Sequence, residues 1–347
     1  MHKRLDSSTF LRVLLSAVLA LMLAIVQATP AQAAGAQQLH KAGLEGGRFC
    51  KPAYSAGTHT LTIQSGGMDR TVVVYVPTRR HEREKLPLVL TLHGSQADAA
   101  TQMSISDMAA AAERGKFVAA APQGIVSAPP GYRWNVPGVT LPAGQPPDDE
   151  QFISDTIDTL ARVLCIDEQR VYGTGYSGGG RMISQYACDH ADRIAAIAPV
   201  VGLRAGYPVS GQAYPDPTTC NPSRPVPVLT FAGTADQVNP YAGGGAPYWQ
   251  YGADAALARW AELNGCRSRV WTRQVTTHVK LLSYRGCRAG ADVQMYVADG
   301  AGHTWPGSEF SFGFYQGALG EITFEIDATD LMESFFRHHV LPWAPHH

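Results

Sequence analysis

One short motif constrains the fold of this chain more than any other feature. Residues 175–179 read Gly-Tyr-Ser-Gly-Gly, a G-x-S-x-G pattern that follows a predicted strand at 170–173 and precedes a predicted helix. In this setting a sharp turn holds the serine, Ser177, in a strained conformation with its hydroxyl exposed, and small neighbours let strand and helix approach. The helix N-terminus favours negative charge beside it. The alternative is a glycine-rich turn with an idle serine.

Predicted strands and helices alternate along most of the chain. The strands are expected at 71–76, 87–92, 117–121, 195–201, 227–232 and 293–297, and the helices at 101–114, 148–163, 251–264 and 327–338. Such alternation builds a mostly parallel central sheet with helices on both faces, so the predicted fold class is α/β. Residues 35–60 are weakly patterned, and 122–148 form a long Pro- and Gly-containing loop of the kind that is often functional.

A serine hydroxyl is a poor nucleophile without a base, and in chains with this motif the order is Ser, then Asp or Glu, then His. His303 lies in the loop Gly-His-Thr-Trp-Pro-Gly after the strand at 293–297, and it is the predicted base. Asp236 follows the strand at 227–232 and a glycine turn, and it is the predicted acid. Asp299 is the alternative acid. The other candidate bases are His190, His278, His338, His346 and His347.

Two backbone N–H groups are expected to stabilise an oxyanion next to Ser177. One belongs to Gly178, and the other to Ser95 in the loop Leu-His-Gly-Ser after the strand at 87–92. His93 in that loop is expected to pack beneath it, although a role as base or metal ligand is the alternative. We expect no metal site and no cofactor, because no dispersed set of Asp, His and Glu suggests one.

The N-terminus is typical of an export signal. A basic start is followed by an apolar stretch over 13–26 and then by Ala31-Gln32-Ala33, a small-x-small cleavage pattern. A retained membrane anchor is the alternative, but the apolar stretch is shorter than the ~20 residues that span a bilayer. The prediction is a signal peptide at 1–34, a single domain at 35–347 and no membrane anchor after cleavage.

Cysteine content and charge narrow the class of protein further. The chain has six cysteines, and an even number in an exported protein favours disulfides over buried free thiols. No C-x-x-C spacing suggests a metal site. The formal net charge is −1, without the basic excess typical of nucleic-acid-binding proteins. We therefore expect no nucleic-acid partner.

Over about 55–340 the chain resembles the extracellular feruloyl-esterase and polyhydroxybutyrate-depolymerase group of α/β-hydrolases. The motifs that carry this resemblance are Leu92-His93-Gly94, Arg133-Trp134-Asn135, Asp148-Asp149, Cys165-Ile166-Asp167, Arg170-Val171-Tyr172, Gly175 to Gly179, Ala195 to Pro199, Gly233 to Asp236, Tyr241 to Gly244, and Gly302 to Gly307. The resemblance implies the α/β-hydrolase fold and catalytic residues at Ser177, Asp236 and His303. The chain departs from many relatives at Ala232, where they have His, and at Gly178, where they have Asn.

The resemblance also suggests which cysteines pair. It implies the disulfides Cys165–Cys188 and Cys266–Cys287, which leaves Cys50 with Cys220. Each of these pairings is an expectation that a structure can test.

The function implied is that of a secreted, extracellular, monomeric serine esterase with an acyl-enzyme mechanism. Feruloyl esters of plant xylan are the first expected substrate, because Trp134, Trp305 and Tyr176 are predicted to form an aromatic wall at the cleft. Polyhydroxybutyrate depolymerase and acetylxylan esterase are the alternatives within the fold. A non-catalytic binding module is an alternative of a different class. A peptidase is a further alternative, although no feature indicates a peptide-specific pocket. Core positions for the two tryptophans are also possible.

Overall fold

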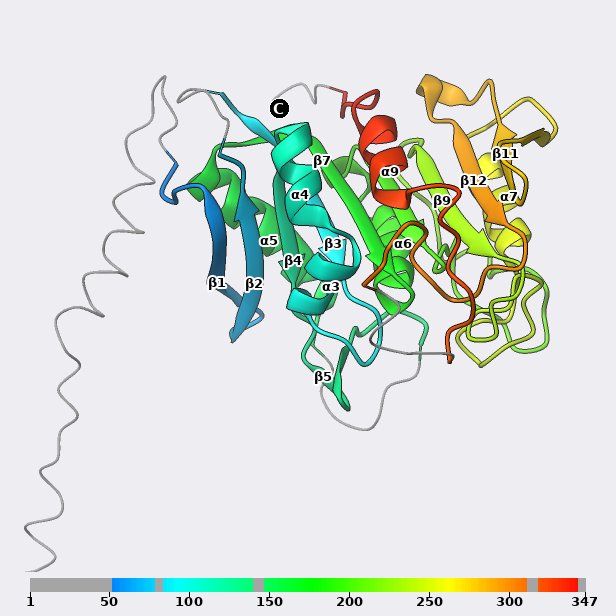
Figure 1. Ribbon diagram of the computed structural model, residues 1–347, viewed down its shortest axis with the longest axis horizontal. Coiled ribbons are helices and arrows are strands. Elements are labelled where there is room, and N and C mark those ends of the chain that lie inside the picture. Colours follow the sequence, from blue (N-terminus) through cyan, green and yellow to red (C-terminus); the bar gives the residue numbers. More distant parts are fainter. Residues whose placement is uncertain (1–51, 79–83, 140–146, 311–317, 343–347) are drawn as a thin grey trace, which may run out of the picture. The chain divides into compact units, whose positions relative to one another are not determined.

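A ten-stranded sheet runs through the described part of the chain (Figure 1). The computed structural model describes residues 52–78, 84–139, 147–310 and 318–342, so the predicted signal peptide and Cys50 lie outside it. The strand order is β1-β2-β4-β3-β7-β8-β9-β12-β11-β10. The strands are β1 (Gly57–Ser65), β2 (Met68–Val76), β3 (Leu86–Leu92), β4 (Val118–Pro122), β7 (Ile166–Tyr176), β8 (Ala196–Val200), β9 (Val228–Gly233), β10 (Trp271–Gln274), β11 (Val279–Tyr284) and β12 (Val293–Ala298).

The inner strands of this sheet are parallel. Each neighbouring pair in the run β4-β3-β7-β8-β9-β12 is parallel, whereas the strands outside this run pair antiparallel. The strands β3, β4 and β8 are almost wholly buried, which explains their predominantly apolar sequences. The prediction of an α/β fold with a mostly parallel sheet is confirmed.

Helices cover both faces of the sheet. Figure 1 shows α3 (Ala99–Ile105), α4 (Met108–Gly115) and α9 (Ala328–Phe336) in front of it. These helices share one buried cluster, and α5 (Asp149–Leu164), α6 (Gly178–Asp189) and α7 (Ala253–Leu263) share the other. Side chains of one strand alternate between the two clusters, because a strand turns successive residues to opposite faces.

Some local structure differs from the sequence-based prediction. The edge strands β1 and β10 were not expected, and neither was the hairpin of β5 (Val126–Ala128) and β6 (Gly131–Arg133) inside the loop 122–148. The helix predicted at 101–114 is two helices, α3 and α4. The chain breaks at Asp107, which takes a left-handed φ of 44°. Thr329 at the start of α9 donates a hydrogen bond of 2.7 Å to the Ser106 carbonyl at this break.

The disulfides correct two of the expected pairings. Cys266–Cys287 is present as predicted, but Cys188 pairs with Cys220, so Cys165–Cys188 and Cys50–Cys220 were wrong. Cys165 is disulfide-bonded as well. Cys188 lies in the last turn of α6, and the loop after β8 folds against this helix. The amide of Gln185 on α6 donates to the carbonyl of Thr219 in that loop at 3.0 Å. This contact brings Cys220 within 4.8 Å of Cys188, measured between Cα atoms.

Candidate active site

The carboxyl end of β7 forms the tight turn that the G-x-S-x-G motif predicts. Ser177 stands between Tyr176, the last residue of β7, and Gly178, the first residue of α6. Its φ of 51° and ψ of −109° are rarely adopted by a residue with a side chain. Its N–H donates to the Val200 carbonyl at 3.0 Å, which ties the strained turn to β8. Backbone strain of this kind is often found at functional sites.

Two glycines make this turn possible. A Cβ atom on Gly179 would lie 2.1 Å from the Leu92 carbonyl oxygen, and one on Gly175 would lie 2.5 Å from the Gly179 carbonyl carbon. Both contacts are with backbone, which has little room to move. The two glycines therefore let α6 start directly against β3 and β7, as the motif requires.

Asp236 and His303 form a buried pair at the end of the sheet where Ser177 lies. Asp236 follows β9 and His303 follows β12. Both strands run parallel to β7, so their carboxyl ends lie at the same end of the sheet as that of β7. The His303 Nδ1 donates to the Asp236 Oδ2 at 2.7 Å, and the two residues are 2% and 3% exposed. The Asp236 Oδ1 accepts the N–H groups of Val238 and Asn239 at 2.8 and 2.7 Å. These bonds hold the carboxylate toward the imidazole.

Tyr176 connects His303 to the turn at Ser177. Its hydroxyl donates to the His303 carbonyl, and the two ring centroids are 5.2 Å apart. The His303 Nε2 faces away from Asp236, is buried, and has no hydrogen-bond partner within the described residues. With its Nδ1 proton held by Asp236, this nitrogen can accept a proton from a nearby hydroxyl.

The loop after β3 packs against the start of α6. The Ser95 N and Oγ atoms lie 3.2 and 2.7 Å from the point where a Cβ on Gly178 would be. A Cβ on Gly94 would lie 2.7 Å from the Tyr176 ring. The loop and the turn are therefore in close contact, and the structure brings together the two residues predicted to supply the oxyanion donors.

His93 supports this loop from inside. It is fully buried, its Nδ1 donates to the Gly94 carbonyl at 2.8 Å, and its Nε2 accepts the Gly124 N–H at 2.9 Å. Burial lowers the pKa of His93 to about 4, so the ring is neutral at neutral pH. The packing role predicted for His93 is confirmed. Across the described ranges, no group of three or more His, Cys, Asp or Glu residues could hold a metal ion.

The aromatic residues predicted to contact substrate are buried. Trp134 is 2% exposed, and its Nε1 donates to the His93 carbonyl at 2.8 Å. Trp305 is 1% exposed, and its Nε1 donates to the Thr329 hydroxyl at 3.0 Å. Tyr176 is 5% exposed. All three therefore support the loops of the site in this structure, and contact of Trp134, Trp305 and Tyr176 with substrate stays a prediction.

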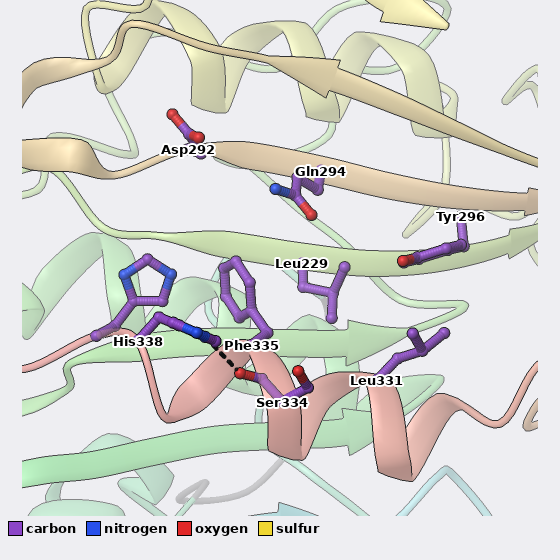
Figure 2. Close-up of a pocket in the computed structure, with 9 residues that line it drawn as sticks. Leu229, Asp292, Gln294, Tyr296, Leu331, Ser334, Phe335 and His338 are labelled. Carbon is purple, nitrogen blue, oxygen red and sulfur yellow. Dashed lines mark hydrogen bonds between the residues drawn. The ribbon is translucent and has the colours of Figure 1, made fainter. Parts of the chain in front are cut away.

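The alternative histidines within the described residues have other partners. His190 stacks on Tyr186 at 4.7 Å, and His278 is exposed and bonds to Glu325. His338 donates to the Ser334 carbonyl at 2.7 Å. It lines a separate cavity of about 330 Å³ between α9 and the strands β9 and β12, shown in Figure 2. None of Ser177, Asp236 and His303 lines that cavity.

Two further residues of the site were missed from sequence. Asn239 donates its side-chain amide to the Val201 carbonyl at 2.6 Å and its N–H to Asp236, so it connects the acid loop to β8. Arg181 lies in the first turn of α6, buried beside Gly178. Its spacing of four residues from Ser177 was a usable signal, because i and i+4 share one face of a helix.

Comparisons with known proteins relate the chain to esterases. No family model matches it. Over 240 residues, 67% of this chain and 42% of the relative, it is 32% identical to feruloyl esterase B of Piromyces equi. It is 30% identical over 175 residues, 50% of this chain and 22% of the relative, to the bifunctional acetylxylan esterase/xylanase XynS20E of Neocallimastix patriciarum. The chain thus spans less than half the length of either relative.

A solved structure supports the fold independently. The acetyl xylan esterase from Aspergillus awamori superposes with a TM-score of 0.52 at 16% identity, over 72% of this chain and 94% of that one. With the strand order, the strained serine turn and the buried Asp–His pair described above, this likeness identifies the fold. The chain has the α/β-hydrolase fold and is related in sequence to feruloyl and acetylxylan esterases.

Proposed function

We propose that the chain is a serine carboxylic-ester hydrolase with Ser177, His303 and Asp236 as its catalytic residues. The observation that carries this proposal is the buried His303–Asp236 pair. Its Nε2 has no hydrogen-bond partner among the described residues, and the pair lies at the carboxyl ends of the parallel strands, where the strained Ser177 turn also lies. Neither a glycine-rich turn without a catalytic role nor a non-catalytic binding module would require such a pair.

The proposed mechanism is acyl transfer in two steps. His303 Nε2 takes the Ser177 hydroxyl proton as Oγ attacks the ester carbonyl, and the oxyanion accepts hydrogen bonds from the Ser95 and Gly178 N–H groups. The imidazolium then protonates the departing alcohol. Water, deprotonated by the same nitrogen, attacks the acyl-enzyme, and the imidazolium returns the proton to the Ser177 Oγ as the acid leaves. Asp236 stabilises the imidazolium throughout without becoming protonated.

The proposed substrates are feruloyl esters of plant xylan. The basis for this choice is the relative named feruloyl esterase B. A second relative, feruloyl esterase D from Neurospora crassa, is 28% identical over 46% of this chain and 49% of its own length. Acetylated xylan is the second candidate, because the XynS20E relative is named for acetylxylan esterase activity.

A paired assay tests the choice of substrate. We expect kcat/KM for ferulate release from feruloylated arabinoxylan oligosaccharides to exceed that for acetate release from acetylated xylo-oligosaccharides by about tenfold or more. An extra ring-stacking contact of ~1.4 kcal/mol would be enough for this factor. Both products are quantified by chromatography from the same enzyme preparation. Faster acetate release would instead favour the acetylxylan candidate, and hydrolysis of neither ester would contradict the proposed function.

We further propose that the protein is exported and acts as an extracellular monomer, without a membrane anchor after signal cleavage. The disulfides support export, because such bonds persist in oxidising compartments. In the part of the chain that the structure describes, no helix has both the length and the apolar character needed to cross a bilayer.

A further inference from the structure

Arg181 is a buried cation one turn into the helix that begins at the nucleophile. It is 6% exposed, and its guanidinium stacks on the Tyr248 ring with the Cζ atom 4.2 Å from the ring centroid. Burial is the main cause that lowers the pKa of Arg181, to about 10, so the group still carries its positive charge at neutral pH. A charge in such a place needs compensation, because burying an ion without a partner is strongly unfavourable.

The described residues supply only part of that compensation: the charge of Asp236 raises the pKa of Arg181, but the charge of Arg204 lowers it. No Asp or Glu among them forms an ion pair with Arg181, its Nε has no hydrogen-bond partner, and its Nη1 reaches only the Asn239 Oδ1 at 3.4 Å. Arg70 shows what compensation looks like elsewhere in the same fold. It is completely buried, and its Nη2 bonds to the Asp149 carboxylate at 2.7 Å.

The unpaired charge lies beside the predicted oxyanion donors. The Arg181 Nη2 is 3.4 Å from the point where a Cβ on Gly178 would be, and the Ser95 N is 3.2 Å from the same point. A side chain at position 178 would occupy this space, so the glycine leaves it to the guanidinium. The guanidinium and the Ser95 N–H thus pack around the same backbone position, Gly178, and the charge is largely shielded from water.

We propose that Arg181 makes the oxyanion hole cationic, so that its fixed positive charge stabilises the oxyanion in addition to the two N–H groups. This inference rests on the proposed esterase function. An ester carbonyl is neutral in the bound substrate and gains negative charge in the transition state. A preorganised buried cation therefore lowers the barrier more than it strengthens substrate binding.

Neutral and charged replacements of Arg181 separate this role from others. We expect Arg181→Met and Arg181→Gln to lower kcat for 4-nitrophenyl acetate by about 10- to 100-fold, somewhat less than loss of a directly bonded donor, with KM changed less than about threefold. Arg181→Lys should recover most of the loss. A boronic acid, which forms an anionic tetrahedral adduct with a serine nucleophile, should lose affinity by a factor similar to kcat.

The matched control is Arg224→Met. Arg224 is part-buried and, like Arg181, has no carboxylate partner among the described residues. It donates to the carbonyls of Ala191 and Ile194, beyond the far end of α6. We expect its kcat and its boronate affinity to match the wild type. Counting active sites by end-point titration with a fluorophosphonate corrects kcat for misfolded protein, so a loss of stability alone leaves the corrected kcat unchanged.

Several outcomes would overturn the inference. An unchanged corrected kcat in both neutral variants contradicts it, and so does equal loss in Arg181→Lys and Arg181→Met. A rise in KM at constant kcat would show instead that Arg181 binds the substrate in its ground state. If the wild-type protein hydrolyses no ester, the proposed function is wrong, and this inference fails with it. The assay of the wild-type protein distinguishes this outcome from the others.

Discussion

Changing Ser177 to alanine will lower kcat for 4-nitrophenyl acetate and methyl ferulate by at least about 10⁴-fold. The change removes the one oxygen at the strained turn that can form an acyl-enzyme, whereas the His303–Asp236 pair and the oxyanion donors remain. The residual rate should come from binding and the oxyanion hole alone. The measurement is steady-state hydrolysis on purified protein, with thermal unfolding recorded to confirm that the variant is folded.

Ser184→Ala is the matched control for this experiment. Ser184 lies on the same helix, α6, is fully buried, and donates its hydroxyl to the Gly180 carbonyl at 2.7 Å. Its removal costs a local hydrogen bond and should leave kcat within about threefold of the wild type. Near wild-type turnover by Ser177→Ala would mean that another residue is the nucleophile.

Changing Asp236 to asparagine should lower kcat by about 10⁴-fold. The Asp236 Oδ1 accepts the N–H groups of Val238 and Asn239. An asparagine that keeps these bonds presents its NH₂ group to the His303 Nδ1, which must then become an acceptor. The proton of the neutral imidazole moves to Nε2, where it blocks transfer from Ser177. The measurement is kcat with 4-nitrophenyl acetate at neutral pH.

The control for Asp236 is the alternative acid, Asp299. It is only four residues before His303 in the sequence, but its Oδ1 accepts the Thr234 hydroxyl at 2.8 Å. Asp299→Asn is therefore expected to keep kcat within about threefold of the wild type. A large loss in Asp299→Asn combined with a small loss in Asp236→Asn would reverse the assignment of the acid.

The inner part of the fold could be predicted from sequence because local and global preferences agree there. Almost wholly apolar stretches such as 87–92 suit a strand only if both faces of the sheet are covered. The spacing of Gly175 and Gly179 around Ser177 is compatible with few structures other than the strand–turn–helix. The three catalytic candidates could then be found from chain order and from their position after strands. Their side chains meet because parallel strands end at one edge.

The rest depends on contacts between distant segments. The break at Asp107 lies in a helix-favouring sequence and becomes understandable only with the hydrogen bond from Thr329 to Ser106. The Cys188–Cys220 bond depends on how an irregular loop folds onto α6. Arg181 could be placed on the right face of α6, but its lack of a carboxylate partner is a property of the folded site.

The most direct test of Ser177 as the nucleophile is covalent labelling with a fluorophosphonate, followed by intact-mass measurement and peptide mapping. We predict one adduct for each wild-type molecule, located on the peptide that contains Ser177, and no adduct on Ser177→Ala under the same conditions. Labelling should follow the same time course as loss of esterase activity. An adduct on a different residue, or full loss of activity without an adduct on Ser177, would contradict the assignment.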